Sequence, residues 1–318
     1  MRSNRLRVCV AGALYYTGIV PAARWWARRR RQDLIVLCYH RASNGDLRRH
    51  LRYLSRHYHV LPLETALEQL GRADGDRRTR LAVTFDDGYR DNYTHAYAIA
   101  RELGVPITVF VIPDYVGGER CFWWREAQHL AELSPAAGAV FARASGTASV
   151  AEREAVLAAA RQELAVPRVV ADERDRVLGW EEIAEMDGSG LVAFGAHTMH
   201  HPVLSRLAAP GDLRDEVERS RTVLERRLGR PVRTFAYPFG KPEHVGDGVR
   251  RAVRDAGYAW ALTTLPGRND ASTDPHLLRR DIVDVSQHWL VVAADVAGVW
   301  TFLAERYHAA ARALGRRP

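Results

Sequence analysis

Short runs of β-branched and other apolar residues alternate along the chain with stretches in which apolar positions recur every three or four residues. The first pattern predicts buried strands, and the second predicts amphipathic helices. Strands are expected at residues 34–39, 81–85, 107–112, 192–196, 234–237, 259–263 and 280–285. Repeated strand–helix units are typical of an α/β fold with a parallel sheet, and seven strands are enough to close a barrel.

Helices are expected between several of these strands, at residues 45–57, 93–103 and 212–228. The last has the clearest limits, because Asp212 can cap its first turn and Gly229 and Pro231 follow its last. Its apolar residues fall on one face, which predicts a packing role for this helix and no part in a site.

The stretch of residues 117–190, between the third and fourth expected strands, is far longer than an ordinary connection. Helical patterns at residues 124–133, 150–164 and 180–186 make it a mainly helical insertion, which we expect beside the active face. Residues 289–314 read as one or two amphipathic helices broken near Gly298. The chain therefore divides into a basic N-terminal segment (1–32), an α/β unit (33–285) and a helical C-terminal tail (286–318).

The N-terminal segment combines an apolar run with flanking arginines. Residues 8–20 are apolar, Trp25 and Trp26 follow, and residues 28–31 are all arginine. The run falls short of the roughly 20 residues that a membrane-spanning helix needs. The pattern predicts an interfacial segment with the tryptophans at headgroup level and the arginines on anionic lipid; a disordered basic tail is the alternative.

The net charge of +8 comes almost entirely from arginine, since Lys241 is the single lysine. A coding bias toward arginine explains this better than a nucleic-acid partner, because no nucleic-acid-binding motif is present. Cys9, Cys38 and Cys121 show no metal-like spacing, which favours a reducing compartment. We therefore expect a cytoplasmic protein, peripheral on the inner face of the membrane; the sequence does not indicate an oligomeric state.

Two carboxylates, Asp86 and Asp87, directly follow the apolar run 81–85. At the carboxyl end of a strand, adjacent side chains diverge, so one can bind a metal while the other moves a proton. Gly88 allows the backbone to turn sharply beneath them. A plain turn with an aspartate cap would explain the same three residues if they stood alone.

Histidines follow the strand expected at residues 192–196. His197 and His201 are four positions apart, a separation at which two imidazoles of one helical turn converge on a divalent ion. His200 offers the alternative spacing of three, which is less well matched. Two imidazoles and one carboxylate leave coordination positions for water and substrate, as in a catalytic metal site.

A third segment, from Arg233 to Lys241, ends an expected strand with the turn Tyr237-Pro238-Phe239-Gly240. Such a turn can direct a backbone N–H at a developing oxyanion, with aromatic faces shaping an acyl pocket. Together the motifs Thr84-Phe-Asp-Asp-Gly, His197-Thr-Met-His-His and Phe235-Ala-Tyr-Pro-Phe-Gly resemble the polysaccharide deacetylase family with the NodB-like domain. That resemblance covers residues 33–285 and implies a distorted (β/α)7 barrel.

The resemblance also implies roles for individual residues. Asp86 matches the catalytic base, and Asp87, His197 and His201 match the ligands of a divalent metal, with Thr198 steadying the loop between the histidines. Zinc is the expected metal, with cobalt, nickel or manganese as alternatives. The backbone N–H of Phe239 would help to hold the oxyanion.

Two family features are missing from this sequence. Ala236 stands where many members have an arginine that orients the base, and the strand expected at residues 280–285 lacks the late histidine that supplies the general acid. His276 and His288 are nearby but unmatched. The acid is therefore left open among His201, His200 and a residue of the insertion.

Four further residues are candidates for the pocket. Trp123 and Trp124 open the insertion and could stack on a sugar, although such aromatics also pack in cores. Tyr39 and His40 end the first strand at the same face, where a structural role is favoured over a catalytic one.

The sequence thus predicts a hydrolase that removes N-acetyl groups from an acetylated sugar, whether a polysaccharide, a glycan or a lipid-linked saccharide, and releases acetate. The alternatives are an O-acetyl esterase or other amide hydrolase that uses the same site, and a non-catalytic glycan-binding protein.

Overall fold

The computed structural model describes residues 2–27, 33–72, 75–133 and 139–303. Its centre is an eight-stranded parallel sheet in the order β7-β6-β5-β4-β3-β1-β8, with β2 paired to the start of β3. The strands are β1 (Leu34–Tyr39), β2 (His59–Val60), β3 (Arg80–Phe85), β4 (Ile107–Val111), β5 (Val192–Ala196), β6 (Thr234–Ala236), β7 (Trp260–Leu262) and β8 (Asp281–Ile282).

The central strands are buried along their whole length. Every residue of β1, β3 and β4 is buried, which matches their continuous apolar runs and is expected of a parallel sheet covered on both faces. At the edge of the sheet, Leu278 forms a parallel bridge with Leu262 of β7, three positions before β8 pairs with β1. Residues 278–282 therefore link the two ends of the strand order, and the sheet curves into the distorted barrel that the sequence predicts.

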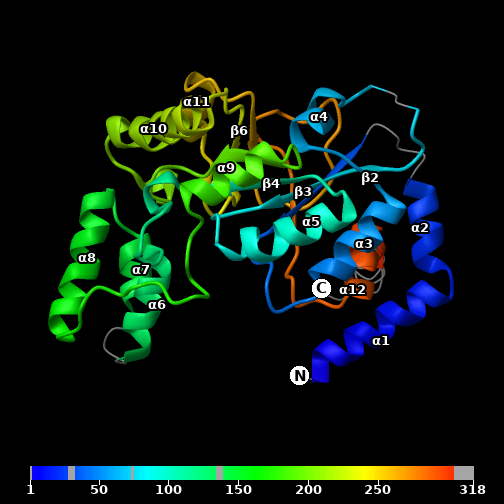
Figure 1. Ribbon diagram of the computed structural model, residues 1–318, viewed down its shortest axis with the longest axis horizontal. Coiled ribbons are helices and arrows are strands. Elements are labelled where there is room, and N and C mark those ends of the chain that lie inside the picture. Colours follow the sequence, from blue (N-terminus) through cyan, green and yellow to red (C-terminus); the bar gives the residue numbers. More distant parts are fainter. Residues whose placement is uncertain (1, 28–32, 73–74, 134–138, 304–318) are drawn as a thin grey trace, which may run out of the picture.

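The helices lie around this sheet (Figure 1). They are α1 (Arg2–Tyr16), α2 (Ile19–Ala27), α3 (Leu47–His57), α4 (Leu63–Glu68), α5 (Ala98–Leu103), α6 (Trp123–Leu133), α7 (Val140–Ser145), α8 (Val150–Glu163), α9 (Trp180–Gly188), α10 (Pro210–Leu228), α11 (Asp247–Asp255) and α12 (Trp289–Val296). In Figure 1, α6, α7 and α8 form a lobe on one side of the sheet, and α1 and α2 lie on the other.

The seven expected strands are confirmed, and all but the last have limits within one residue of those expected. β8 covers two residues rather than the whole of 280–285, and β2, also of two residues, was not expected because so short a strand leaves no pattern. The expected insertion is mainly helical, and its additional short helix α7 was likewise missed.

Two helix predictions need correction, and a third is confirmed. The helix α10 begins at Pro210 after Ala209, so Asp212 lies inside its first turn and is not its cap; its end at Gly229, with φ 68°, is as predicted. Residues 93–103 are not one regular helix, because a π-helical turn at Asn92–Tyr97 precedes α5. In the tail, α12 ends at Val296 and a second short helical stretch follows Gly298, which confirms the predicted break.

The N-terminal segment is helical. Both α1 and α2 are ordered elements of the fold, and α1 packs along α12. The alternative of a disordered basic tail is therefore wrong for residues 2–27. Residues 28–31, the arginine run, lie outside the described residues.

Candidate active site

The carboxyl ends of β3 and β5 carry the acidic and histidine residues that the sequence singles out. Asp86 and Asp87 directly follow β3, and His197 directly follows β5. The backbone N–H of Asp86 donates to the carbonyl of Tyr39 (2.8 Å), and that of His197 donates to the carbonyl of Val111 (2.9 Å). Each of these backbone hydrogen bonds continues the sheet by one residue and so fixes the position from which the side chain projects.

Asp87, His197 and His201 converge on one point. Their ligand atoms all lie within 4.8 Å of one another, and all three residues are buried. The Oδ1 atom of Asp87 lies 3.6 Å from Nε2 of His197 and 3.8 Å from Nε2 of His201. Two imidazoles and a carboxylate in this arrangement can hold a divalent cation and leave positions open for water and substrate.

Left-handed backbone conformations bring these ligands together. Asp87 has φ 72° and His201 has φ 56°, and Gly88 follows with φ 74°. A Cβ atom at Gly88 would lie 2.9 Å from Cγ1 of Val111, so the turn has no room for a side chain. Non-glycine residues in this conformation cost on the order of 1 kcal/mol or more, and such strain clusters at functional sites.

The protonation states of the three residues suit a cation. Nδ1 of His197 lies 2.7 Å from the carbonyl oxygen of Ala236, which places the ring proton on Nδ1 and leaves Nε2 as a ligand. Burial, reinforced by the neighbouring His197, lowers the pKa of His201 well below its usual value and keeps this imidazole neutral. Burial raises the pKa of Asp87, a penalty that a bound cation would offset.

The loop between the two histidines is anchored to α10. The hydroxyl of Thr198 accepts from the backbone N–H of His201 (2.9 Å), as the expected steadying role requires. One carboxylate oxygen of Glu216 accepts from the backbone N–H groups of Met199 (3.0 Å) and His200 (2.9 Å). The other lies 2.6 Å from Nδ1 of His200, so Glu216 holds the loop at three points.

Asp86 faces an arginine rather than the three metal-ligand candidates. Arg280 donates from its two terminal nitrogens to the two carboxylate oxygens of Asp86, each at 2.7 Å, and its Nε donates to the carbonyl of Thr263 (2.9 Å). Burial is the largest influence on the pKa of Asp86 and would raise it, but Arg280, together with His197 and His40, outweighs burial and holds that pKa well below its usual range. Asp86 is therefore ionised, oriented and free of the metal position.

A cavity of about 230 Å³ opens onto both groups of residues. Asp86, Asp87, His197 and His201 line its base, and the walls are formed by His40, Trp124, Gln128, Phe141, Phe239, Thr264 and Ile282. A second cavity of about 590 Å³ adjoins it and shares His40, Asp87, Trp124 and Gln128 as lining residues. The smaller cavity is therefore a narrow pocket at the metal-ligand candidates, and the larger cavity is a wider cleft beside it.

The model of the family described as polysaccharide deacetylase matches residues 73–261, which is more than half of the chain. The chain belongs to the polysaccharide deacetylase family. It is a hydrolase of N-acetyl amide bonds in carbohydrates, and the Asp87–His197–His201 cluster fits the metal dependence of the family.

Several deacetylases are similar to this chain. YxkH of Bacillus subtilis (strain 168), which its name assigns to the polysaccharide deacetylases, is 22% identical over 265 residues, covering 80% of this chain and 73% of its own. IcaB from Ammonifex degensii has a TM-score of 0.58 at 23% identity, covering 83% of this chain and 96% of its own. The deacetylase PplD of Streptococcus pyogenes, solved in complex with acetate, has a TM-score of 0.54 at 19% identity, with coverage of 79% and 92%. At these identities the structural likeness concerns the fold.

The deacetylase cavity includes three of the residues predicted to surround the metal. His40 lines both cavities from the end of β1. The ring of Trp124 lies 4.4 Å from that of His201, and the ring of Phe239 lies 5.1 Å from it, so both pack against a ligand candidate. Phe239 also has a left-handed φ of 61°, as a tight turn at this position requires.

Other predicted pocket residues lie elsewhere. Trp123 is buried and does not line the cavity; its Nε1 donates to the carbonyl of His201 (2.9 Å), so it supports a ligand candidate rather than a sugar. Tyr39 is buried against Phe85, with its hydroxyl 3.3 Å from Nδ1 of His50, and it lines neither cavity of the site. The idea that His200 borders the pocket is wrong, because its ring turns toward Glu216.

The turn after β6 contributes less to the cavity than predicted. The hydroxyl of Tyr237 donates to the carbonyl of His276 (3.0 Å), so this side chain points into the core, and Pro238 is buried beside it. Of the three residues proposed for substrate or oxyanion contact, Phe239 alone is among the described residues that line the cavity. Thr198 is buried in the loop behind the histidines.

Sequence reasoning missed several residues of the site, above all Arg280. Arg280, just before β8, contacts the base in place of the arginine that is absent at Ala236. The sequence around Arg280 gave no sign of this contact, because Asp86 is 194 positions away. Glu216 was assigned to a helix with a packing role only. Gln128 and Phe141, from the insertion, and Ile282, from β8, were not singled out.

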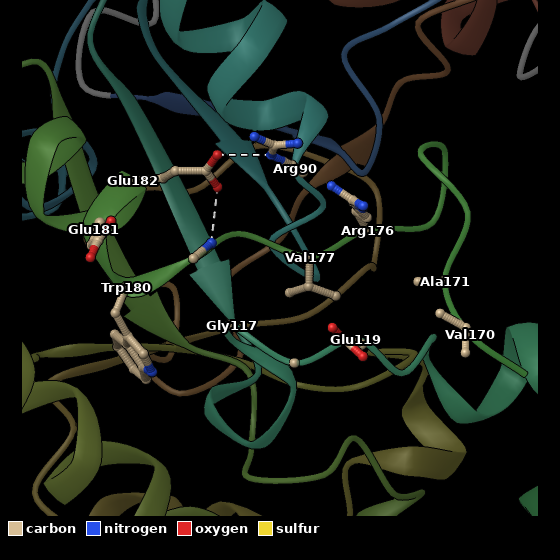
Figure 2. A pocket seen from close by; sticks show the side chains of 12 residues that line it. Arg90, Gly117, Glu119, Val170, Ala171, Arg176, Val177, Trp180, Glu181 and Glu182 are labelled. Atoms are coloured by element: carbon tan, nitrogen blue, oxygen red, sulfur yellow. Dashed lines mark hydrogen bonds and ion pairs between the residues drawn. The ribbon is translucent and has the colours of Figure 1, made fainter. Parts of the chain in front are cut away.

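A larger cavity lies away from this site. It measures about 660 Å³ and is lined by residues from the two ends of the insertion and by Arg90, which pairs with Glu182 at 2.8 Å. Figure 2 shows this pair and Trp180. None of the predicted catalytic or metal-binding residues line it. The chemistry of the site, rather than the size of the cavity, identifies the smaller pocket as the active one.

Proposed function

We propose that the chain removes N-acetyl groups from a carbohydrate at the Asp87–His197–His201 cluster, with Asp86 as the general base. The observation that carries this assignment is the division of labour between two adjacent aspartates. Asp87 faces two imidazoles, and Asp86 faces the guanidinium of Arg280. One carboxylate is thereby committed to a cation and the other to proton transfer.

The donor set fits a divalent transition metal, and zinc fits it best. Imidazole nitrogen with one carboxylate oxygen, in a three-residue set, is a ligand combination of catalytic zinc sites; cobalt, nickel and manganese are the alternatives. Asp87, through a carboxylate oxygen, and His197 and His201, through Nε2, would hold the ion. When bound, such an ion supplies Lewis acidity, which polarises the acetyl carbonyl and acidifies a water molecule.

The protein groups then carry out the proton transfers. Asp86 accepts the proton of the attacking water; Arg280 keeps it ionised and fixes the direction of its lone pairs. The backbone N–H of Phe239, a residue that lines the cavity, would support the developing oxyanion, and the rings of Trp124, Phe141 and Phe239 would surround the acetyl methyl group.

We further propose His40 as the general acid. Three candidates for this role follow from the sequence: His201 is a metal-ligand candidate, His200 points to Glu216, and the insertion places no titratable side chain among the described residues of the small cavity. His40 is the remaining imidazole in that described lining, and one of its ring nitrogens lies within 4.8 Å of a carboxylate oxygen of Asp86. From there it can protonate the leaving amine.

The wider cavity is where we place the rest of the saccharide. It adjoins the small pocket, and Arg41 lies 3.5 Å over the ring of Tyr89 in its wall. A polysaccharide, a glycan or a lipid-linked saccharide would reach the metal through this open side. The Asp86–Arg280 pair removes the main ground for a non-catalytic glycan-binding protein, because the base has its orienting arginine.

Acetate release from N-acetylated sugars, measured together with bound metal, tests the assignment. The zinc-loaded protein is expected to release acetate from at least one chito-oligosaccharide or N-acetylated glycan. Asp86→Asn should keep its zinc and lose activity by a factor of roughly 100 to 10,000. If Asp86→Asn were as active as the native protein, Asp86 would not be the base; loss of zinc from this variant would place it among the ligands.

A further inference from the structure

The exposed faces of α1 and α2 are apolar. Residues 6, 9, 10, 13 and 16 share one face of α1, and all five are exposed apolar or weakly polar side chains. On α2, which follows after a bend of 68°, Ile19, Trp25 and Trp26 are exposed as well. The large hydrophobic residues among these are between 39% and 77% exposed. They are half of all the exposed large hydrophobic residues in the part of the chain that the structure describes. So much exposed apolar surface in one place marks a binding surface.

The opposite face of α1 fixes the pair to the body of the protein. Ala11 packs with Leu290 and Val291 of α12, and the ring of Tyr15 lies 5.2 Å from that of Trp289. Arg7 pairs with Asp295 at 3.3 Å. The apolar face is therefore held outward by a docked helix.

A basic, aromatic cavity of about 260 Å³ adjoins this face. Arg49, Arg52 and Arg56 of α3 line it at helical spacing, and the other lining residues are Tyr53 and His57 of the same helix, Tyr15 and Trp289. Tyr15 contacts Tyr16 of the apolar face at 5.4 Å between ring centroids, so α1 borders both features.

Few carboxylates offset the arginines around this cavity. Asp46 lies 3.5 Å from Arg49, and Glu102 lies 3.8 Å from Arg52. Arg24 of α2 adds a further guanidinium, 3.2 Å from the hydroxyl of Tyr53 in the same wall. The cavity keeps an excess of positive charge, and the sequence adds four arginines at residues 28–31.

We propose that α1 and α2 bind an anionic phospholipid surface, with their apolar face in the interfacial layer and a lipid phosphate in the Arg49–Arg52–Arg56 cavity. Apolar residues flanked by tryptophan and arginine are the features of helices that lie in a bilayer interface. Each arginine near an anionic surface contributes to binding, and a phosphate between guanidiniums receives charge-assisted hydrogen bonds.

The geometry favours lying on the membrane over crossing it. Of the described helices, none is long and apolar enough to span a bilayer alone, and α1 and α2 meet that condition only as a pair bent by 68°. At 1.5 Å per residue α1 is about 22 Å long, against a hydrocarbon core of about 30 Å. Its contacts with α12 also hold α1 against the folded domain.

Vesicle sedimentation tests this surface. The full chain is mixed with vesicles of phosphatidylcholine alone or of phosphatidylcholine with phosphatidylglycerol. We expect binding to the second kind that weakens with added salt. Trp25→Ser with Trp26→Ser tests the apolar face, and Arg52→Gln with Arg56→Gln tests the cavity; each pair should lower the apparent affinity about tenfold or more.

Two exposed positions provide matched controls. Val170→Ser removes an exposed apolar side chain from the insertion, and Arg214→Gln removes an exposed arginine from α10; neither should change vesicle binding. Arg52 and Arg56 lie on the exposed face of α3, so their substitution should not disturb folding. The test therefore stays valid even if the variant with both tryptophans replaced does not fold.

Three results would overturn the proposal. The first is that the protein does not sediment with the anionic vesicles. The second is that the control variants lose as much binding as the test variants, and the third is that neither the tryptophan pair nor the arginine pair changes the affinity. Concentration-dependent self-association that Trp25→Ser with Trp26→Ser abolishes, without vesicle binding, would assign the face to a second copy of the chain instead.

Discussion

Arg280 and Asp86 form a two-point ion pair inside the barrel, with both nitrogen–oxygen distances at 2.7 Å, although 194 positions separate them in the chain. Arg280 is fully buried, and Asp86 is nearly so. A planar guanidinium matches a carboxylate at two points, so this pair fixes the orientation of Asp86 as well as its charge.

Replacing Arg280 by glutamine is expected to slow acetate release on the order of 100-fold, because Asp86 loses the partner that orients it. The pH–rate profile should change as well. Arg280 helps to hold the pKa of Asp86 well below its usual range, so Asp86 of the native protein is ionised near neutral pH. Without Arg280, burial raises that pKa, and the acidic limb of the profile moves to higher pH.

Stability provides the second measurement on Arg280→Gln. A carboxylate with a depressed pKa in the folded state stabilises the protein above its unfolded pKa, and this contribution is lost as the pH falls through the folded value. The variant should therefore be destabilised most near neutral pH, by roughly 3 kcal/mol, since it leaves a buried carboxylate unpaired. Unchanged stability and an unchanged acidic limb would together show that the pair does not act on Asp86.

His40→Gln is expected to slow hydrolysis of an N-acetyl sugar by roughly 100-fold, because the leaving amine must gain a proton. An activated aryl acetate has a leaving group that needs no proton, so its hydrolysis should fall much less. Rates on the two substrates, measured with the same zinc-loaded variant, give the comparison. An equal loss on both would argue against His40 as the acid and for a role in binding.

Removal of the metal should lower both activity and thermal stability. A chelator is expected to abolish acetate release and to lower Tm by several degrees, because an ion that binds the folded state stabilises it in proportion to the logarithm of its concentration. Asp87→Asn should show a much smaller Tm increase on adding zinc, whereas Asp247→Asn, at an exposed position on α11, should respond as the native protein does. A native-sized response in Asp87→Asn would remove Asp87 from the ligand set.

Glu216→Gln is expected to weaken zinc affinity about tenfold or more while leaving kcat near the native value at saturating zinc. Glu216 touches no ligand atom, but it holds the backbone and ring of His200 next to the ligand candidate His201. Glu218→Gln, on the exposed face of the same helix, is the matched control. Equilibrium zinc titration of the two variants decides the point, and equal affinities would limit Glu216 to a packing role.

The part of the site that lies at strand ends could be predicted from the sequence. Buried strands leave continuous apolar runs, and polar residues directly after such runs must gather at one edge of a parallel sheet; Asp86, Asp87 and His197 were found in this way. The spacing of His201 supplied the fourth residue. These inferences use information within about ten positions of the chain.

Residues that reach the site through the closure of the barrel could not be predicted. Arg280 pairs with Asp86 because residues 278–282 bridge β7 and β1, and nothing near Arg280 in sequence records that contact. The orientation of the His200 ring likewise depends on a distant residue, the carboxylate of Glu216 on α10. The start of α10 was misplaced for a local reason, since both Pro210 and Asp212 suit a first turn.

The bridge at Leu278 also sets a lower limit on the length of an active fragment. The segment that matches the family ends at residue 261, and it begins after β1. A protein trimmed to those limits would keep Asp86, Asp87 and both metal-ligand histidines, but it would have neither His40 nor Arg280. It would also lose β1, which pairs with β3 along its whole length, and would lack the groups that orient the base and protonate the leaving amine.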